Sequence, residues 1–175
     1  HYGTYVMTKH DVIRQYGAFM IPVERLRPLD VEIVKNIQLA DEQIKFAGTA
    51  EAFLLSGSDT IHLHVIKYNN DVVGFFKLDT AYATGYDFCS EHGLGLRSFA
   101  VDKNQQGKGI GTGSVKALFP YLKSNYAEYD SIYLTVNCKN PGAVSCYKKG
   151  GFVDTHEKYL GGEAGPQHIM KGQII

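Results

Sequence analysis

The sequence predicts one α/β domain of the α+β type, in which a mixed sheet carries helices on its faces. Segments with strand-like alternation of apolar and polar residues are interleaved with segments of helical spacing, which is the pattern of that class. The chain has 175 residues, 44% of them hydrophobic, which is enough for a single well-buried core. No internal repeat, low-complexity tract or linker divides the chain.

The first third of the chain predicts one strand and two helices. Residues 19–26 begin with an apolar run and predict a strand, in which Pro22 indicates an edge or a bulge. Asp30 is suited to cap a short helix whose apolar residues recur at helical spacing. A second helix is predicted over residues 41–55, and Gly57 is a suitable end for it.

The middle of the chain predicts a hairpin, a long connection and a third strand. Residues 61–68 alternate strictly between apolar and polar, as in a half-buried strand, and the Asn-Asn-Asp turn after them leads into a return strand over 72–78. Residues 80–93 have no period and are long for a connection in a compact domain, which favours a functional or mobile loop. Residues 94–101 predict the next strand.

The last third predicts two more helices and three strands. A glycine-rich turn leads into a helix from about Ile110, which Pro120 is expected to kink or to end early. A strand over 131–136, a helix over 141–149, an extended segment over 152–159 and a short strand over 168–171 complete the chain.

Composition limits the classes of partner. Lys plus Arg equals Asp plus Glu, so no basic excess favours binding to nucleic acid. No apolar run approaches the ~18 residues of a membrane span, and no signal peptide is expected. Three cysteines without metal-ligand spacing predict reduced thiols in a cytoplasmic protein and no metal site. Two histidines, His62 and His64, share a strand face and are expected in a core or surface role.

The first residues are left out of the predicted fold. The chain opens with His1, so we expect residues 1–6 to be a tag remnant or a disordered segment, with Met7 as a plausible native start. Residues 7–175 are then expected to form the single domain.

The strongest chemical signal is the glycine-rich turn at residues 105–111, Gln-Gln-Gly-Lys-Gly-Ile-Gly. Glycines let the backbone turn tightly and bring its N–H groups close to a ligand. The helix that follows adds unpaired N–H donors and the positive end of its dipole, so the turn is suited to bind an anion such as a phosphate. Its spacing differs from that of a P-loop, because Lys108 is followed by Gly109.

Two blocks together resemble the GCN5-related N-acetyltransferase (GNAT) superfamily. Gln106-x-x-Gly109-x-Gly111 is similar to the family's pyrophosphate-binding signature, and residues 140–152 are similar to its Asn, Ala, Tyr, Gly-Phe pattern. The resemblance extends over about 19–171. It implies a mostly antiparallel sheet of six to seven strands with a splay after the fourth strand. It also implies an enzyme that moves the acetyl group of acetyl-CoA to a primary amine by direct attack in a ternary complex.

The resemblance also implies roles for particular residues. The Phe99 N–H would face the thioester oxygen, Val101 would pair with the pantetheine amides, and Asn140 would contact the pantetheine arm or cap its helix. Tyr147 stands where the family commonly has a tyrosine that protonates the departing sulfur. The full set of expected cofactor-binding residues is Phe99, Ala100, Val101, Gln106, Gly107, Lys108, Gly109, Ile110, Gly111, Thr112 and Asn140.

The general base is not identified by the sequence. Many family members carry a carboxylate on the strand just before the position of Phe99, whereas this chain has Arg97 and Ser98 there. Acidic or basic side chains at or near the 80–93 loop are candidates, directly or through water. They are Asp79, Asp87, Glu91 and His92.

The acceptor is expected to be a small-molecule amine. Tyr82, Asp87 and Glu91 are the candidate substrate residues; acidic residues on the second predicted helix and further loop aromatics could add to them. A loose similarity to bacterial polyamine acetyltransferase-like proteins favours an acceptor such as a polyamine. The alternatives are a protein N-terminal or lysine acetyltransferase and a catalytically silent acetyl-CoA sensor. A homodimer is common in the family. The further residues named for the acceptor are Asp41, Glu42, Glu51, Tyr86 and Phe88.

Overall fold

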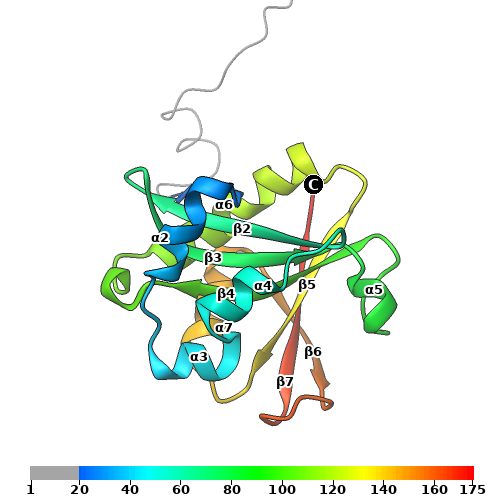
Figure 1. Cartoon of the computed structure of the whole chain (residues 1–175). Coiled ribbons are helices and arrows are strands. Elements are labelled where there is room, and N and C mark those ends of the chain that lie inside the picture. The colour runs from blue at the N-terminus through cyan, green and yellow to red at the C-terminus, as the bar shows by residue number, and fades with distance from the viewer. Residues whose placement is uncertain (1–19) are drawn as a thin grey trace, which may run out of the picture.

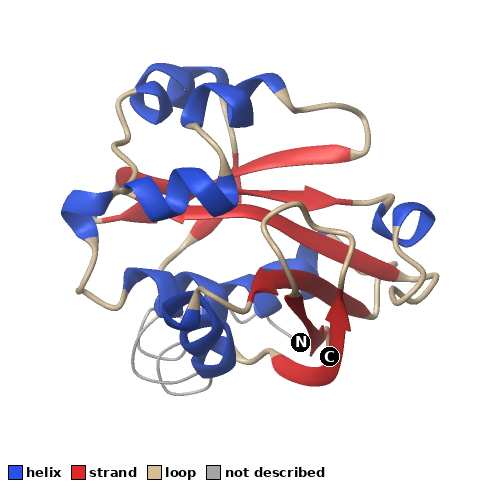
Figure 2. Cartoon of the chain, turned by 90° about the horizontal axis from the view of Figure 1, so that it is seen from below, coloured by secondary structure: helices blue, strands red, loops and turns tan. Residues whose placement is uncertain are grey.

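The computed structural model describes residues 20–175 and contains one seven-stranded sheet in the order β1-β2-β3-β4-β5-β7-β6. All neighbouring strands are antiparallel except β4 and β5, which are parallel. Helices lie on both sides of this sheet (Figure 2), so the predicted fold class is confirmed. The expectations for residues 1–6 and Met7, and the first position of the strand predicted over 19–26, lie outside the described residues.

The N-terminal third differs from the prediction at one helix. The helix expected over 41–55 is two helices, because Gly48 takes a left-handed φ of 85° and Thr49 then caps a new helix by accepting a hydrogen bond from the Ala52 N–H at 3.1 Å. The predicted first strand is reduced to three residues. The elements are β1 (Val23–Arg25), the 3-10 helix η1 (Pro28–Asp30), α2 (Val31–Lys35), α3 (Asp41–Ala47) and α4 (Ala50–Leu55).

The predicted hairpin is present as β2 (Ile61–Tyr68) and β3 (Asp71–Asp79). Asn69 and Asn70 both have positive φ, 51° and 68°, as the two central residues of a type I′ hairpin turn require. The long connection after β3 contains one helical turn, α5 (Tyr82–Gly85), and leads into β4 (Gly93–Val101).

In the last third, the expected early end of the helix at Pro120 is wrong. Helix α6 (Ile110–Asn125) continues past Pro120, and its side chains on both sides of the proline, Leu118 and Leu122, are buried in the core. This packing offsets the hydrogen bond that a proline removes. The remaining elements are η2 (Lys103–Gln105), β5 (Ser131–Asn137), α7 (Pro141–Gly150), β6 (Val153–Tyr159) and β7 (Gln167–Gln173).

Two apolar clusters cover the two faces of the sheet. One cluster joins α6 to side chains such as Phe76, Leu94 and Ile132. The other joins α2 and α4 to Phe75 and Ala100 on the opposite face. Alternate residues of β3 therefore enter different clusters, as the two-residue period of a strand requires.

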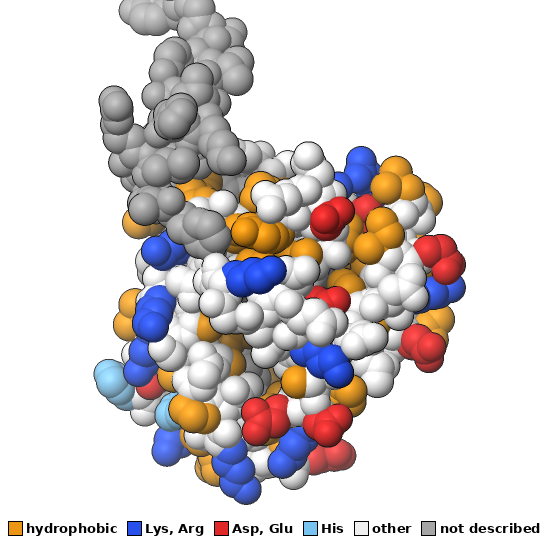
Figure 3. Space-filling model, turned by 90° about the vertical axis from the view of Figure 1, so that its left-hand side faces the viewer, with side chains coloured by type: hydrophobic (Ala, Val, Ile, Leu, Met, Phe, Trp, Pro, Cys, Tyr) orange, Lys and Arg blue, Asp and Glu red, His pale blue; other side chains and the backbone are white. Residues whose placement is uncertain are grey.

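The surface carries mixed charge. On the face drawn in Figure 3, outside the part drawn in grey, Lys and Arg side chains are interspersed with Asp and Glu side chains. Within residues 20–175, none of the helices combines the length and the apolar character that crossing a bilayer requires.

The sheet opens between β4 and β5. The two strands pair only through Gly93–Ser131, Leu94–Ile132 and Gly95–Tyr133. Beyond these pairs β4 keeps its partner β3, and β5 keeps its partner β7. In Figure 1, β2, β3 and β4 cross the view roughly horizontally, whereas β5, β7 and β6 run steeply. This is the splay that the family resemblance implied, and it leaves a gap with unpaired backbone on both sides.

His64 is a buried polar side chain that ties β2 to α6. Its Nε2 lies 2.7 Å from the Tyr121 hydroxyl, its Nδ1 lies 3.0 Å from the His62 carbonyl oxygen, and its ring stacks on Phe76. Burial is the main cause that lowers the pKa of His64 from 6.5 to about 4. The imidazole is therefore neutral in the folded protein at physiological pH, in the core role that the sequence analysis expected.

This pKa predicts a pH-dependent loss of stability. Between pH 6.5 and about 4 the unfolded chain binds a proton at His64 that the folded protein excludes, so the free energy of unfolding should fall as the pH falls, by about 3 kcal/mol over the window. Urea unfolding of the wild type and of His64→Gln at pH 7 and pH 4.5 measures this. The variant should lose less stability between the two pH values, whereas exposed His92→Gln should behave as the wild type. An unchanged pH dependence in His64→Gln would contradict the assignment.

Candidate active site

A cavity of about 840 Å³ lies where β4 and β5 separate. It runs from the glycine-rich loop before α6, past the free edges of the two strands, to α3, α5 and the loop between β6 and β7. Most of the residues that the sequence analysis named line it: Tyr82, Phe99, Ala100, Val101, Gln106, Gly107, Gly109, Ile110, Gly111, Thr112, Asn140 and Tyr147.

Eight of the residues named for the site are not in the cavity lining: Lys108, Asp87, Glu91, His92, Asp79, Asp41, Glu51 and Phe88. Lys108 points its ammonium to Gln105 Oε1 at 2.9 Å and over the Tyr68 ring. Asp87 and Glu91 are exposed side chains of the connection between β3 and β4. The candidate base His92 is also exposed and outside the lining.

The glycine-rich loop has the backbone geometry of an anion cradle. Gly107 and Gly109 have positive φ of 81° and 75°, and Gly109 is the N-cap of α6 without a side chain that caps the helix. The first N–H groups of a helix have no partner within the helix. Because α6 is 16 residues long and its first turn lines the cavity, these donors are available to an anionic ligand there.

A bulge in β4 shapes the wall beside this loop. Lys77 pairs with Arg97 and Phe75 pairs with Ala100, so Ser98 and Phe99 together face one residue of β3. Ser98 takes a left-handed φ of 54°. Bulges of this kind bend a strand and redirect the groups that follow. Here the bulge interrupts the ladder with β3, in the stretch of β4 that has no pairing with β5.

The Val101 carbonyl, expected to pair with a pantetheine amide, already has protein partners. The Gln43 side chain donates to it from α3 at 2.8 Å, and the Gln106 side chain approaches at 3.4 Å. The Gln43 Oε1 in turn accepts a hydrogen bond from the Ala40 N–H at 2.9 Å. Gln43 therefore links the start of α3 to the cavity wall, a contact that the sequence alone did not indicate.

Tyr147 lies on α7 between two aromatic rings. The Phe99 and Phe152 rings contact it edge to face, each with a centroid distance of 5.8 Å. Burial raises the pKa of its phenol well above the usual value of 10. The hydroxyl therefore keeps its proton at physiological pH. Among the described residues, no side chain or backbone group forms a hydrogen bond with it.

Asn140 caps α7 and also lines the cavity. Its side-chain oxygen accepts a long hydrogen bond of 3.4 Å from the Ala143 N–H. The capping role that the sequence analysis gave as one alternative is thus present. The side chain remains next to the space that a ligand would fill.

The separation of the strands begins at a glycine covered by a tyrosine. Tyr82 of α5 is buried, and a Cβ at Gly95 would overlap its ring. Gly95 is the last residue of β4 that pairs with β5. Tyr82 thus closes the narrow end of the gap, and Tyr86, the residue that follows α5, contacts it with a centroid distance of 4.3 Å.

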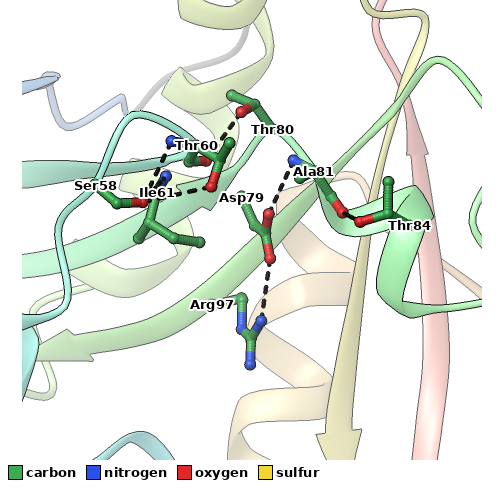
Figure 4. Close-up of polar contacts among 8 residues, drawn as sticks. All are labelled: Ser58, Thr60, Ile61, Asp79, Thr80, Ala81, Thr84 and Arg97. Carbon is green, nitrogen blue, oxygen red and sulfur yellow. Dashed lines mark hydrogen bonds and ion pairs between the residues drawn. The ribbon is translucent and has the colours of Figure 1, made fainter.

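Charged groups lie on the wall formed by β3 and β4. Asp79 is buried; its Oδ2 accepts a hydrogen bond from Arg97 at 3.0 Å and its Oδ1 accepts one from the Ala81 N–H at 2.9 Å (Figure 4). Both oxygens of this candidate base are therefore engaged. Lys77 and Arg97 line the cavity, and the sequence analysis did not name Lys77. The sequence signal that could have drawn attention to Lys77 is the pair of charged residues, Lys77 and Asp79, two positions apart in an otherwise apolar strand.

Comparison with known proteins places the chain in a family. The sequence model of the acetyltransferase (GNAT) family matches residues 31–152. The chain is 33% identical over 136 residues to the spermine/spermidine N(1)-acetyltransferase of Bacillus subtilis (strain 168), a match that covers 74% of this chain and 86% of the relative. It is 34% identical, with the same coverage, to a probable spermine N(1)-acetyltransferase of Bacillus subtilis subsp. natto (strain BEST195).

Solved structures share the fold. The aminoglycoside acetyltransferase AAC(6')-Ib in complex with coenzyme A superimposes with a TM-score of 0.72 at 18% identity, over 87% of this chain and 94% of that chain. A spermidine N-acetyltransferase from Vibrio cholerae in complex with CoA and spermine gives a TM-score of 0.63 at 16% identity, over 88% and 95%. With the family match over residues 31–152, these findings show that the chain belongs to the GNAT family and is an acetyl-CoA-dependent N-acetyltransferase.

Proposed function

We propose that the protein transfers the acetyl group of acetyl-CoA to a primary amine of a small molecule, by direct attack while both substrates are bound. One observation carries this proposal. A single cavity joins a glycine cradle at a helix N-terminus, two strand edges with free backbone groups and a protonated, half-buried tyrosine. We also propose that it acts in the cytoplasm, where its three free cysteines would stay reduced.

The cofactor end of the cavity fits a pyrophosphate. The N–H groups of the first turn of α6 and of the loop with Gly107 would donate to the phosphate oxygens, and the helix dipole favours their negative charge. The free edges of β4 and β5 would hold the amide groups of the pantetheine arm, because backbone groups in a gap need hydrogen-bond partners. When such an amide binds, the Gln43 side chain would either share the Val101 carbonyl oxygen with it or give up its own hydrogen bond to that oxygen.

Two groups of this chain would act at the acetyl end. Acetyl-CoA, when bound, supplies an acetyl group activated as a thioester. The Phe99 N–H, which follows the bulge at Ser98, would stabilise the negative charge that develops on the carbonyl oxygen. Tyr147 would give its proton to the sulfur as the carbon–sulfur bond breaks. A phenol titrates near ~10 and a thiol near ~8.5, so this transfer requires the hydroxyl to lie in direct contact with the departing sulfur. The acceptor amine must lose its ammonium proton before it attacks the carbonyl carbon.

The names of the two Bacillus relatives make polyamines the first acceptors to test. The same measurement addresses the alternatives. Thiol release from acetyl-CoA with a lysine peptide would support a protein acetyltransferase. A protein that bound acetyl-CoA and turned over no amine would instead be a sensor.

Replacing Tyr147 by Phe tests the proposed acid. The substitution removes one oxygen that has no hydrogen bond to any described residue, so the fold should be retained. We expect kcat to fall at least tenfold, in the range usual for a lost general acid, while the Kd for acetyl-CoA changes less than twofold. Tyr159→Phe, on β6 outside the cavity, is the matched control. An unchanged kcat in Tyr147→Phe would show that another group protonates the sulfur.

Replacing Gly109 by Val tests the cradle. A side chain at this left-handed position would be strained and would intrude on the phosphate site, so acetyl-CoA should no longer raise the melting temperature. Gly48→Val is the control, because Gly48 is also left-handed but a Cβ there meets nothing within 4 Å. Both variants should lose stability, and only Gly109→Val should lose the response to acetyl-CoA. A full response in Gly109→Val would refute the assignment of the cradle.

A further inference from the structure

Two cationic side chains lie next to each other on the acceptor side of the cavity. Lys77 of β3 and Arg97 of β4 are direct partners in the antiparallel pairing, so their side chains leave the same face of the sheet. Both line the cavity. This face also carries α3 and α5, on the side opposite the core that α6 covers.

Only one of the two positive charges has a carboxylate partner. Arg97 donates to the Asp79 Oδ2 at 3.0 Å, and the other oxygen of Asp79 is engaged by the Ala81 N–H (Figure 4). For Lys77, no carboxylate oxygen of the described residues lies within ion-pair distance. Its pKa is lowered by burial and then by the positive charge of Arg97, which together outweigh the attraction of Asp79. The wall thus holds a surplus positive charge in a partly dehydrated place.

None of the other charged residues of the cavity lining forms an ion pair with Lys77. Glu42 and Lys45 on α3 and Glu163 in the β6–β7 loop are exposed lining residues. With Lys77 and Arg97 the lining holds three cations and two carboxylates, and Asp79 supplies a third carboxylate to Arg97 from outside the lining, so Lys77 is distinguished by its missing partner and not by the net charge of the cavity. The aspartate that neutralises Arg97 lies behind the wall and outside the lining.

The cradle proposed for the phosphates lies beyond the end of β4 that is remote from Arg97. Because of the bulge, the stretch from Arg97 to Val101 spans only three residues of β3, which is roughly 10 Å at the rise of a strand. The proposed pyrophosphate site begins further along, at Gln106. A cofactor seated in that cradle therefore brings its thioester, which is uncharged, toward the part of the wall that holds Lys77.

We propose that Lys77 and Arg97 bind a carboxylate of the acceptor, so that the acceptor is an amine that also carries an acid group, as amino acids do. The inference rests on the proposed acetyl transfer and names the class of its acceptor. Arg97 keeps guanidinium N–H groups beyond the one that Asp79 uses, and Lys77 adds three donors. Tyr86, whose ring lies 6.0 Å from the Arg97 guanidinium carbon, would flank the carbon chain.

Pairs of amines that differ only in a carboxylate test the proposal. Turnover should be compared for ornithine and putrescine, lysine and cadaverine, histidine and histamine, and tyrosine and tyramine. We expect kcat/KM to be at least about tenfold higher for the carboxylate-bearing member of the pairs that react, because one charge-assisted hydrogen bond is worth that much. Higher kcat/KM for the decarboxylated members, or for spermidine, would overturn the inference and leave the proposed acetyl transfer intact.

Binding gives a second readout that does not require turnover. In the presence of coenzyme A, the carboxylate-bearing member of a pair should raise the melting temperature more than its partner. If no amine were acetylated but this difference were found, the carboxylate-binding subsite would stand and the proposed transfer would fail. If the two members of each pair raised the melting temperature equally, or not at all, the proposed carboxylate-binding subsite would be overturned.

Variants of Lys77 identify the residue responsible. Lys77→Gln should raise KM for the carboxylate-bearing amine about tenfold and change KM for the decarboxylated amine by less than twofold, and Lys77→Glu should reverse the preference within a pair. Lys123→Gln, exposed on α6 outside the cavity, should match the wild type. An unchanged response to acetyl-CoA verifies folding. If Lys77→Gln raised KM equally for both members of a pair, Lys77 would not bind the carboxylate and the proposal would be wrong.

Discussion

The rest of the site depends on the short pairing between β4 and β5. Three residue pairs hold the two parallel strands together, and beyond Gly95 each strand keeps only its outer partner. Tyr82 lies against Gly95 at the point where the pairing stops. Buried backbone groups need hydrogen-bond partners, so a gap with free strand edges favours a ligand that carries amides of its own. A further stretch of β4–β5 pairing would satisfy these groups internally and remove the cavity.

Helix α6 connects this gap to the core. Its inner face, with Ile110, Val115 and Leu118, is buried against the sheet, which fixes the direction of the helix axis. The free N–H groups of its first turn are then fixed as well, at the mouth of the gap. A cradle that depends on backbone donors can be precise only if the helix behind it is rigid. The same side chains therefore contribute to stability and to the proposed binding of the pyrophosphate.

The sequence predicted those parts of the fold that depend on local patterns. The alternation in residues 61–68 and the Asn69-Asn70 turn defined a hairpin that the structure contains. Two predictions about where helices end were wrong, for different reasons. Gly48 divides the helix expected over 41–55, whereas Pro120 does not end α6, because core packing on both sides supports the helix. Lys77 was missed because its partner is set by the register of β3 against β4, and a single sequence does not contain that register.

The same register explains why a neutral composition is compatible with a charged wall. The balance of 18 basic and 18 acidic residues excludes a strong field over the whole molecule, but it says nothing about neighbours across strands. A carboxylate at position 97 would lie opposite Lys77 and neutralise it. Instead Arg97 stands there, and the acid of this wall, Asp79, is turned toward Arg97 from a buried position. A wall that pairs its own arginine and leaves its lysine free opposes the approach of a purely cationic ligand. Charge complementarity then selects among amines by their second functional group, since the amine itself is common to all of them.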